Sequence, residues 1–305
     1  SSSDTDVTGP SGLYTVTGNV GTNFIVTPTK ILPMPNAING LTAADASRIQ
    51  QHVIGTFPFS DPYKMIAADA NKSNAITAAD ASLIQQAVLG SPPAQTYFSL
   101  NTWRFVPKAY VFPVPTNPWS LGMAPYFPES ISLTTGASNQ DFIGMKLGDV
   151  NSSANPLNLG NQIPVLNWKV KDQILEQNIT FVAEFRADHF DDLLALQFGL
   201  QFDPAQIQFL EIENIAGSPL QAGNFGLYKV GSGEIRAFLA MVQGLSLADE
   251  TPVFRVKFKA LVSGVRLSEV LDVSDAVLLS EAYATDFTPG PLHLLYDGVS
   301  TGTTA

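Results

Sequence analysis

Oxygen-bearing side chains recur at a fixed spacing in one twelve-residue stretch, which runs from Asp69 to Asp80. They stand at its positions 1, 3, 5, 9 and 12, and Ala75 at position 7 can add its main-chain carbonyl. Six or more oxygen ligands are what the hard cation Ca²⁺ requires, and this spacing is that of an EF-hand loop. The stretch therefore predicts a calcium site, the alternative being a polar turn that leads into a helix capped by Thr77. The predicted ligands are Asp69, Asn71, Ser73, Ala75, Thr77 and Asp80.

The residues that follow belong to an internal repeat. The segment 41–55 recurs 35 residues later as 76–90, and eleven of the fifteen positions are identical. Both copies combine good helix formers with apolar residues at helical spacing, and both end in a glycine, Gly55 or Gly90. These features predict two short amphipathic helices, which need to pack on each other because neither is long enough to persist alone.

Only the second copy of the repeat is preceded by a complete loop. Before Asp45, Gly40 and Thr42 match loop positions 7 and 9, but Met34 stands where the first ligand should be. A second opening half occurs far downstream, over 149–153. Joining the two halves predicts a split calcium site, whereas the alternative is that the downstream half is an Asx-type turn. The predicted ligands of the split site are Asp149, Asn151, Ser153, Gly40, Thr42 and Asp45.

Two calcium loops, each followed by a helix, resemble the type I dockerin family over about residues 30–156. The resemblance implies a small helical calcium-binding module that binds a protein partner. The chain departs from the family pattern in two places. Asn74 stands where EF-hand loops usually have glycine, and the first loop is split as though the module were permuted.

Between the second helix and the downstream half-loop, residues 92–148 are rich in proline and aromatic side chains without helical period. They predict an extended, irregular insert. Rings such as Trp103 and Trp119 offer stacking surfaces for sugars, but the favoured interpretation is that the aromatics pack in a core. Two strand-like runs near the N-terminus, Leu13–Thr17 and Phe24–Val26, predict a hairpin that resembles the end of an immunoglobulin-like repeat.

In the C-terminal half the periodicity changes to two. Apolar and polar side chains alternate over 196–202 and over 254–260, as they do in half-buried strands. About nine such short strands, separated by turn residues, predict a two-sheet β-sandwich. The segments 196–204 and 252–260 resemble the cohesin family, over about residues 162–300. That resemblance implies a sandwich of the kind that receives dockerins.

Composition excludes several functional classes. The 16 Lys and Arg against 27 Asp and Glu give a net charge of −11, which argues against a nucleic-acid partner. The absence of cysteine, three histidines far apart and no catalytic motif predict a protein that is not an enzyme. No apolar run approaches the ~18 residues of a membrane span. The chain opens on Ser1 rather than Met, which we expect of a mature or excised piece.

These features together predict a multidomain, mainly β, non-catalytic protein, extracellular or on a bacterial cell surface, with calcium-dependent dockerin–cohesin-like contacts. Its partner would be another copy of itself or a cohesin- or dockerin-type protein, and the two halves would pair either within one chain, as a rigid spacer, or head-to-tail between chains, as a fibre. The alternative is a carbohydrate-binding module or spacer of a larger secreted polysaccharide-degrading protein. The predicted domains are a hairpin over 1–30, a dockerin-like module over 31–156 with its insert at 92–148, and a cohesin-like sandwich over 157–305.

Overall fold

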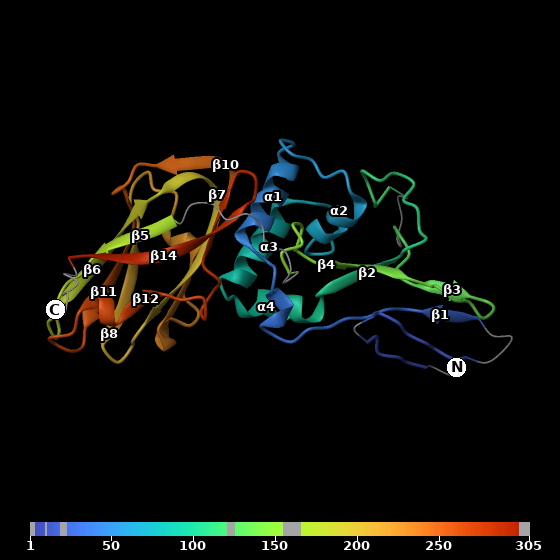
Figure 1. Ribbon diagram of the computed structural model, residues 1–305, viewed down its shortest axis with the longest axis horizontal. Helices are drawn as coiled ribbons and strands as arrows, with labels where there is room; N and C mark the ends of the chain where they lie inside the picture. The colour runs from blue at the N-terminus through green and yellow to red at the C-terminus, as the bar shows by residue number, and fades with distance from the viewer. Residues whose placement is uncertain (1–3, 10, 19–22, 121–125, 155–165, 299–305) are drawn as a thin grey trace, which may run out of the picture.

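The computed structural model describes residues 4–9, 11–18, 23–120, 126–154 and 166–298. A helical part and a β-sheet part lie side by side along the longest axis of the molecule (Figure 1). Two small strand ribbons extend from the helical part, away from the sheet. Within these described ranges, no helix has both the length and the apolar character needed to cross a membrane.

The helical part contains one 3-10 turn and four α-helices. Their bounds are Asn36–Ile38 (η1), Ala43–Val53 (α1), Pro62–Ala68 (α2), Ala78–Val88 (α3) and Pro92–Leu100 (α4). The two helices predicted from the repeat are confirmed as α1 and α3, which pack on each other. Each begins at a threonine, Thr42 or Thr77, that forms a capping box with the aspartate three residues on. Each is followed by a glycine with positive φ, 80° at Gly55 and 93° at Gly90.

The insert is more regular than predicted. It opens with α4, because Pro92 and Pro93 occupy the first turn of a helix, where the missing proline N–H costs nothing. Farther along, Phe112 and Phe127 are buried in the core of the helical part. The predicted packing role of the aromatic side chains is confirmed for these two rings. The prediction of an irregular, extended insert was wrong for residues 92–100, but the described residues between 108 and 130 are irregular, as predicted.

Each ribbon is an antiparallel pair of short strands. One pairs β2 (Trp103–Pro107) with β4 (Phe142–Lys146), and the other pairs β1 (Phe24–Val26) with β3 (Ile131–Leu133). The predicted N-terminal hairpin was wrong, because Leu13–Thr17 is not a strand and β1 pairs with the insert instead. A three-residue run carries too little pattern to specify a partner more than 100 residues away.

Ten strands form one curled sheet in the C-terminal half. They are β5 (Leu166–Lys171), β6 (Thr180–Asp188), β7 (Phe190–Phe202), β8 (Ile207–Glu213), β9 (Phe225–Gly226), β10 (Glu234–Leu247), β11 (Pro252–Ala260), β12 (Leu271–Val273), β13 (Glu281–Ala284) and β14 (Pro289–Asp297). The order is β8-β11-β6-β5-β14-β13-β7-β10-β9, with β12 beside β7. The mainly β class is confirmed. The two predicted sheets are joined into one, because β14 pairs with β5 on one side and with β13 on the other.

The core of this sheet is rich in aromatic rings. Trp168 and Phe185 both lie against Phe254, with ring centroids 5.4 Å and 4.2 Å away. All three side chains are fully buried. They come from β5, β6 and β11, so the sheet curls around a single shared core.

Strand β7 is buried on both faces over residues 193–200, which differs from the half-buried strand predicted over 196–202. Phe198 faces the core of the sheet, and Gln197, which points to the other side, is only 2% exposed. Helix α1 lies against β7 and β10 and covers this outer face (Figure 1). The helical part is therefore docked on the sheet of its own chain.

Candidate metal centres

The predicted loop 69–80 links α2 to α3 and closes through hydrogen bonds to Asp69, its first predicted ligand. The carboxylate of Asp69 accepts the main-chain N–H of Ser73 at 2.8 Å and that of Asn74 at 2.9 Å. Lys72 and Asn74 adopt left-handed backbone conformations, with φ of 60° and 67°. Asparagine tolerates this conformation better than most residues, so Asn74 makes the turn for which such loops usually use glycine.

Asp80 closes the same loop from its other end. Its Oδ1 accepts the N–H of Asn71 at 3.0 Å, and its Oδ2 accepts the N–H and the hydroxyl of Thr77 at 2.8 and 3.0 Å. The side chains of Asp69 and Asp80 have no exposed surface. The loop therefore holds two buried carboxylates, one at each end.

The structure places the two halves of the predicted split loop against each other. Val150 and Asn151 donate their main-chain N–H groups to Oδ1 of Asp45, at 2.8 and 3.2 Å. The hydroxyl of Ser153 donates to the carbonyl of Gly40 at 3.1 Å. Gly40 has a φ of 81°, and a Cβ there would lie 2.6 Å from the backbone nitrogen of Ala154. Glycine is thus required where the two halves meet.

The continuous loop and the split loop share one hydrogen-bond pattern. Asp149, like Asp69, accepts the N–H groups four and five residues later, at 2.9 and 3.1 Å. Asp45, like Asp80, accepts the N–H and hydroxyl of the threonine that caps the following helix. Ser73 donates to the carbonyl of Ala75 at 3.1 Å, as Ser153 does to that of Gly40. An Asx-type turn is present at Asn151, but it is one part of this larger arrangement.

Burial makes these carboxylates unfavourable in their charged form. Burial first, and then the negative charge of Asp149, raise the pKa of Asp45 to about 8. Burial also raises the pKa of Asp149 and of Asp69. A divalent cation beside such a carboxylate pair would stabilise the ionised form and offset the repulsion. The donor chemistry of both loops therefore fits Ca²⁺.

The number of charged donors is small. In the described part of the chain, no group of three or more His, Cys, Asp and Glu side chains is placed to hold a metal ion. A metal in either loop would rest on two carboxylates together with amide, hydroxyl and carbonyl oxygens. Such a mixed oxygen set suits calcium and gives it modest affinity.

The split loop continues directly into the contact between helices and sheet, which we call the seam. Ser47 of α1 donates its hydroxyl to the carbonyl of Leu194 at 3.3 Å and accepts the N–H of Met241 at 3.1 Å. Ala43, in the first turn of α1, donates its N–H to Oε1 of Gln197 at 3.1 Å. The helix that carries Asp45, a predicted ligand, is thus hydrogen-bonded to two strands of the sheet.

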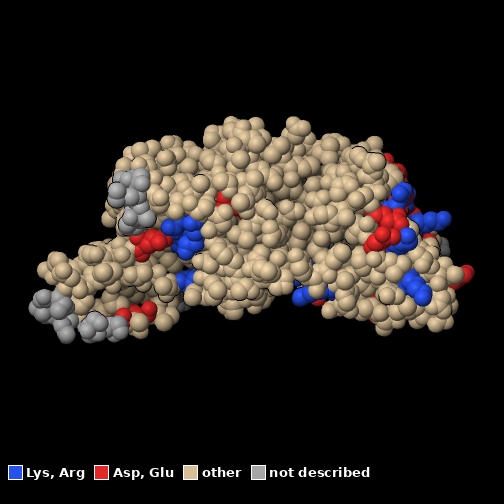
Figure 2. Space-filling view, turned by 180° about the vertical axis from the view of Figure 1, so that it is seen from behind, with Lys and Arg blue, Asp and Glu red and all other residues tan. Residues whose placement is uncertain are grey.

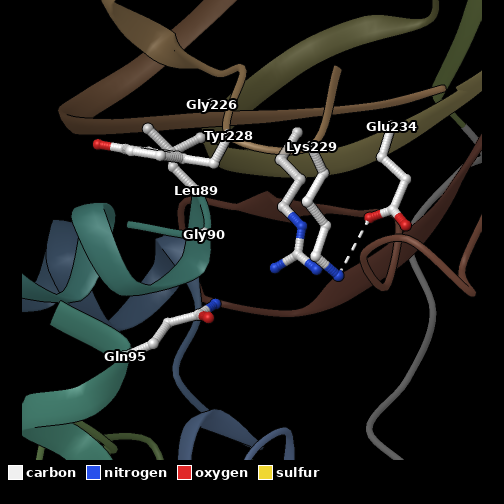
Figure 3. A pocket seen from close by; sticks show the side chains of 8 residues that line it. Leu89, Gly90, Gln95, Gly226, Tyr228, Lys229 and Glu234 are labelled. Atoms are coloured by element: carbon white, nitrogen blue, oxygen red, sulfur yellow. Dashed lines mark ion pairs between the residues drawn. The ribbon is translucent and has the colours of Figure 1, made fainter. Parts of the chain in front are cut away.

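At the other end of the seam, the end of α3 approaches the sheet so closely that glycine is needed. A Cβ on Gly226 would lie 2.0 Å from the carbonyl oxygen of Leu89. The guanidinium of Arg236 donates to the carbonyl of Val88 at 3.2 Å. Figure 3 shows the small hollow beside this contact, with Leu89 on the helical side and Tyr228 on the side of the sheet.

The sequence did not reveal which residues form the seam. Ser82 in the second copy of the repeat corresponds to Ser47 in the first, yet Ser82 is exposed whereas Ser47 is buried. Because the two copies are so similar, the sequence does not indicate which of the two helices docks on the sheet. Gln197 looked like an outward-facing polar residue of an alternating strand, and only the structure shows it covered by α1.

The tryptophans that a sugar-binding platform would use are half-buried. The indole Nε1 atoms of both Trp103 and Trp119 are buried. The ammonium of Lys30 lies 4.5 Å from the ring centroid of Trp103. Neither ring is the exposed platform that the carbohydrate-binding alternative requires.

No family model matches the chain, and no curated protein matches it. Solved cohesin structures are similar to part of it. The sixth cohesin of Acetivibrio cellulolyticus scaffoldin B, solved with a Cel5 dockerin mutant, is 12% identical and has a TM-score of 0.34, over 44% of this chain and 98% of that one. A chain of a type I cohesin–dockerin complex from Clostridium thermocellum is 16% identical and has a TM-score of 0.34, over 46% of this chain and 94% of that one. A non-cellulosomal cohesin from Archaeoglobus fulgidus is 10% identical and has a TM-score of 0.29, over 44% of this chain and 90% of that one. The dockerin-like resemblance stays a prediction from the sequence.

Proposed function

We propose that this chain is a non-catalytic structural module of an extracellular protein, in which two calcium ions brace a helix pair docked on its own β-sheet. The observation that carries the proposal is the matched hydrogen bonding of the two loops. One of them is assembled from segments 105 residues apart in the sequence. A chance polar turn has no reason to reproduce the contacts of another loop at such a distance.

Each loop offers calcium two carboxylates, three side-chain oxygens of amide or hydroxyl groups, and one or more carbonyls. Calcium would neutralise the buried carboxylates and join the backbone segments that carry them. The ligands of the continuous loop would be Asp69, Asn71, Ser73, Ala75, Thr77 and Asp80. Those of the split loop would be Asp149, Asn151, Ser153, Gly40, Thr42 and Asp45, with the glycine contributing its carbonyl.

The link between the split loop and the seam supports a structural role. Asp45 lies two residues after Ala43 and two before Ser47, both of which are hydrogen-bonded to the sheet. A metal held by Asp45 and Asp149 would fix the start of α1, and α1 is the helix that covers β7 and β10. Calcium in this loop would therefore stabilise the docking of the helical part as well as the loop itself.

The docking of both halves within one chain favours a closed spacer over a head-to-tail fibre. The faces that would pair between chains already contact each other, with Ala195, Phe238 and Tyr283 of the sheet buried among residues of the helical part. An assembly through these same faces would first have to open the seam. We therefore propose a rigid element that separates or orients other parts of a longer protein.

The test is the calcium stoichiometry of the calcium-free chain, measured by isothermal titration calorimetry. We expect two calcium ions per chain, with dissociation constants on the order of 10⁻⁴–10⁻³ M, as in other extracellular modules. Asp149→Asn should remove one site and Asp69→Asn the other. At 1 mM calcium each lost site should lower the free energy of unfolding by about 0.4–1.4 kcal/mol.

Asp141→Asn is a matched control, because it removes a carboxylate that is 59% exposed and pairs with the exposed Lys108. It should leave both sites intact. Failure of the wild-type chain to bind calcium would overturn the proposal. Two sites persisting in Asp149→Asn would overturn the split loop alone.

A further inference from the structure

The β2–β4 ribbon contacts both candidate calcium loops and sends a basic side chain to each. Trp103 lies opposite Lys146 and Arg104 opposite Met145 in the register of the two strands. Residues opposite each other share a face, and neighbours along a strand alternate, so Arg104 and Lys146 point to opposite faces of the ribbon. Both side chains are at least nine-tenths buried.

Arg104 is aimed at the first ligand of the continuous loop without being bonded to it. Its Nη1 lies 3.9 Å from Oδ2 of Asp69 and has no hydrogen-bond partner, although it is buried. The rest of the guanidinium is held in place, with Nε donating to Glu129 at 2.7 Å and the group stacked 4.6 Å from the ring of Phe127. A buried, unpaired N–H beside a buried carboxylate is unfavourable, and a shift of about 1 Å would join them.

Lys146 lies near the split loop, where it interacts electrostatically with Asp149 and Asp45 without a direct ion pair to either. Its ammonium donates to the carbonyls of Asn36 and Asn39, and Asn39 immediately precedes the ligand Gly40. Three residues after Lys146, the chain reaches the ligand Asp149. Each loop thus has one cation near its two carboxylates, 3.9 Å from Asp69 at the continuous loop and beyond ion-pair distance at the split loop.

We propose that Arg104 and Lys146 are resident counter-cations, which partly neutralise the loop carboxylates when calcium is absent and oppose calcium when it binds. This inference rests on the proposed calcium function. When both of its carboxylates are ionised, a metal-free loop with one cation beside it carries about one uncompensated negative charge instead of two. The same fixed charge repels Ca²⁺, since like charges a few ångströms apart in partly buried surroundings interact strongly.

Two consequences follow when the calcium concentration around the chain varies. The loops keep their shape when calcium is low, because a cation of the chain itself remains beside the carboxylates. Their affinity for calcium is also lower than the two-carboxylate ligand set alone would give. Arg104 and Lys146 therefore set the calcium concentration at which the loops fill, without being ligands.

The test is a calcium titration of the Arg104→Met chain followed by calorimetry. We expect the affinity of the continuous loop to rise by about tenfold or more, because the repelling charge is gone while the side chain still fills its space. Arg104→Lys keeps the charge and should stay close to the wild type. Arg255→Met removes an equally charged side chain that pairs with Glu184 on the sheet, far from the loops, and should change neither site.

A substitution at the surface should change the calcium affinity in the opposite direction, and it does not require a new side chain to be buried. Glu129 is 46% exposed and holds Arg104 through Nε. Glu129→Gln should release the guanidinium toward Asp69 and weaken calcium binding several-fold, whereas the surface control Asp141→Asn should not. Lys146→Met should strengthen the split loop in the way that Arg104→Met strengthens the continuous one.

The outcomes separate the two proposals. A wild-type chain that takes up no calcium overturns the calcium function and this inference with it. A wild-type chain that binds calcium, with Arg104→Met binding no more tightly, overturns the counter-cation role alone. Weaker binding in Arg104→Met would show instead that Arg104 positions Asp69 for the metal. The inference is supported if calcium affinity rises in Arg104→Met and falls in Glu129→Gln while the control variants bind calcium as the wild type does.

Discussion

Asp45 is a buried carboxylate whose pKa is raised to about 8 by burial and by the charge of Asp149. In the folded chain it therefore keeps its proton up to a higher pH than in the unfolded chain, where its pKa is about 3.9. In calcium-free buffer, the free energy of unfolding should fall as the pH rises from about 4 to about 8, by up to about 1.4 kcal/mol per pH unit for this one proton. Calcium binding, which needs the ionised form, should strengthen over the same range.

Chemical denaturation at a series of pH values, with calcium removed, measures this dependence. Asp45→Asn cannot ionise, so its stability should vary less with pH over that window. An unchanged slope in Asp45→Asn would show that other groups govern the response. If calcium affinity were constant between pH 5 and pH 8, the raised pKa of Asp45 would be wrong.

The sequence predicts the proposed ligand residues but not the proposed counter-cations. A calcium loop needs oxygen-bearing side chains at positions 1, 3, 5, 9 and 12, and in the continuous loop all of these positions lie in one short segment of the sequence. Even the split loop keeps that order within each half. Arg104 and Lys146 reach the loops through the pairing of β2 with β4, about 40 residues apart, and no local spacing indicates that contact.

Gly226 of β9 marks the closest approach between the helical part and the sheet. A methyl group there would lie 2.0 Å from the carbonyl oxygen of Leu89, which is a main-chain atom that cannot rotate away. Gly226→Ala should therefore push the end of α3 off the sheet and destabilise the chain by about 1–3 kcal/mol. Thermal unfolding should show a midpoint lower by about 2–10 °C.

Gly223→Ala is the control for Gly226→Ala, because a Cβ at Gly223 meets no atom within 4 Å. It changes the same residue type three positions away and should leave the midpoint nearly unchanged. Equal unfolding midpoints for both variants would mean that the seam adjusts to the added methyl group with no loss of stability. The helical part would then be only loosely attached to the sheet.

Elements with local signals were predicted well, and those defined by distant contacts were not. Helices α1 and α3 carry their own caps, threonine at the start and glycine at the end, so their existence followed from the repeat. Helix α4 was missed although two prolines in a first turn are a start signal. The burial of the outer face of β7 was also missed, because a strand with Gln197 at an alternate position is expected to be half exposed.

The whole molecule is expected to be a closed monomer, since the helical part and the sheet cover each other within one chain. Sedimentation velocity should give a single species of about 33 kDa in millimolar calcium and in EGTA. Large species in calcium that dissolve in EGTA would contradict the closed spacer and favour head-to-tail assembly. Large species in both buffers would favour pairing through exposed strand edges, such as those of the β1–β3 ribbon.

Charge is distributed unevenly over the molecule. On the face seen in Figure 2, few Lys, Arg, Asp and Glu side chains reach the surface over the middle, and they gather toward the two ends. In the sheet part, Glu250 pairs with both Lys169 and Arg186, and Lys169 also pairs with Asp188. Such a network is screened by salt, so the stability of the sheet part depends in some measure on ionic strength, unlike its apolar core.

The split loop also determines how a pull on the chain would travel through the molecule. Tension entering from the N-terminal side reaches Asp45 early, and the hydrogen bonds from Val150 and Asn151 to Asp45 connect that point to the segment leading into the sheet. The roughly one hundred residues between these positions form a side branch that the junction bypasses, and tension reaches this branch only through the pairing of β1 with β3. A metal ion at the junction would act as a reversible mechanical link, and the enclosed helices would unravel only after it had opened.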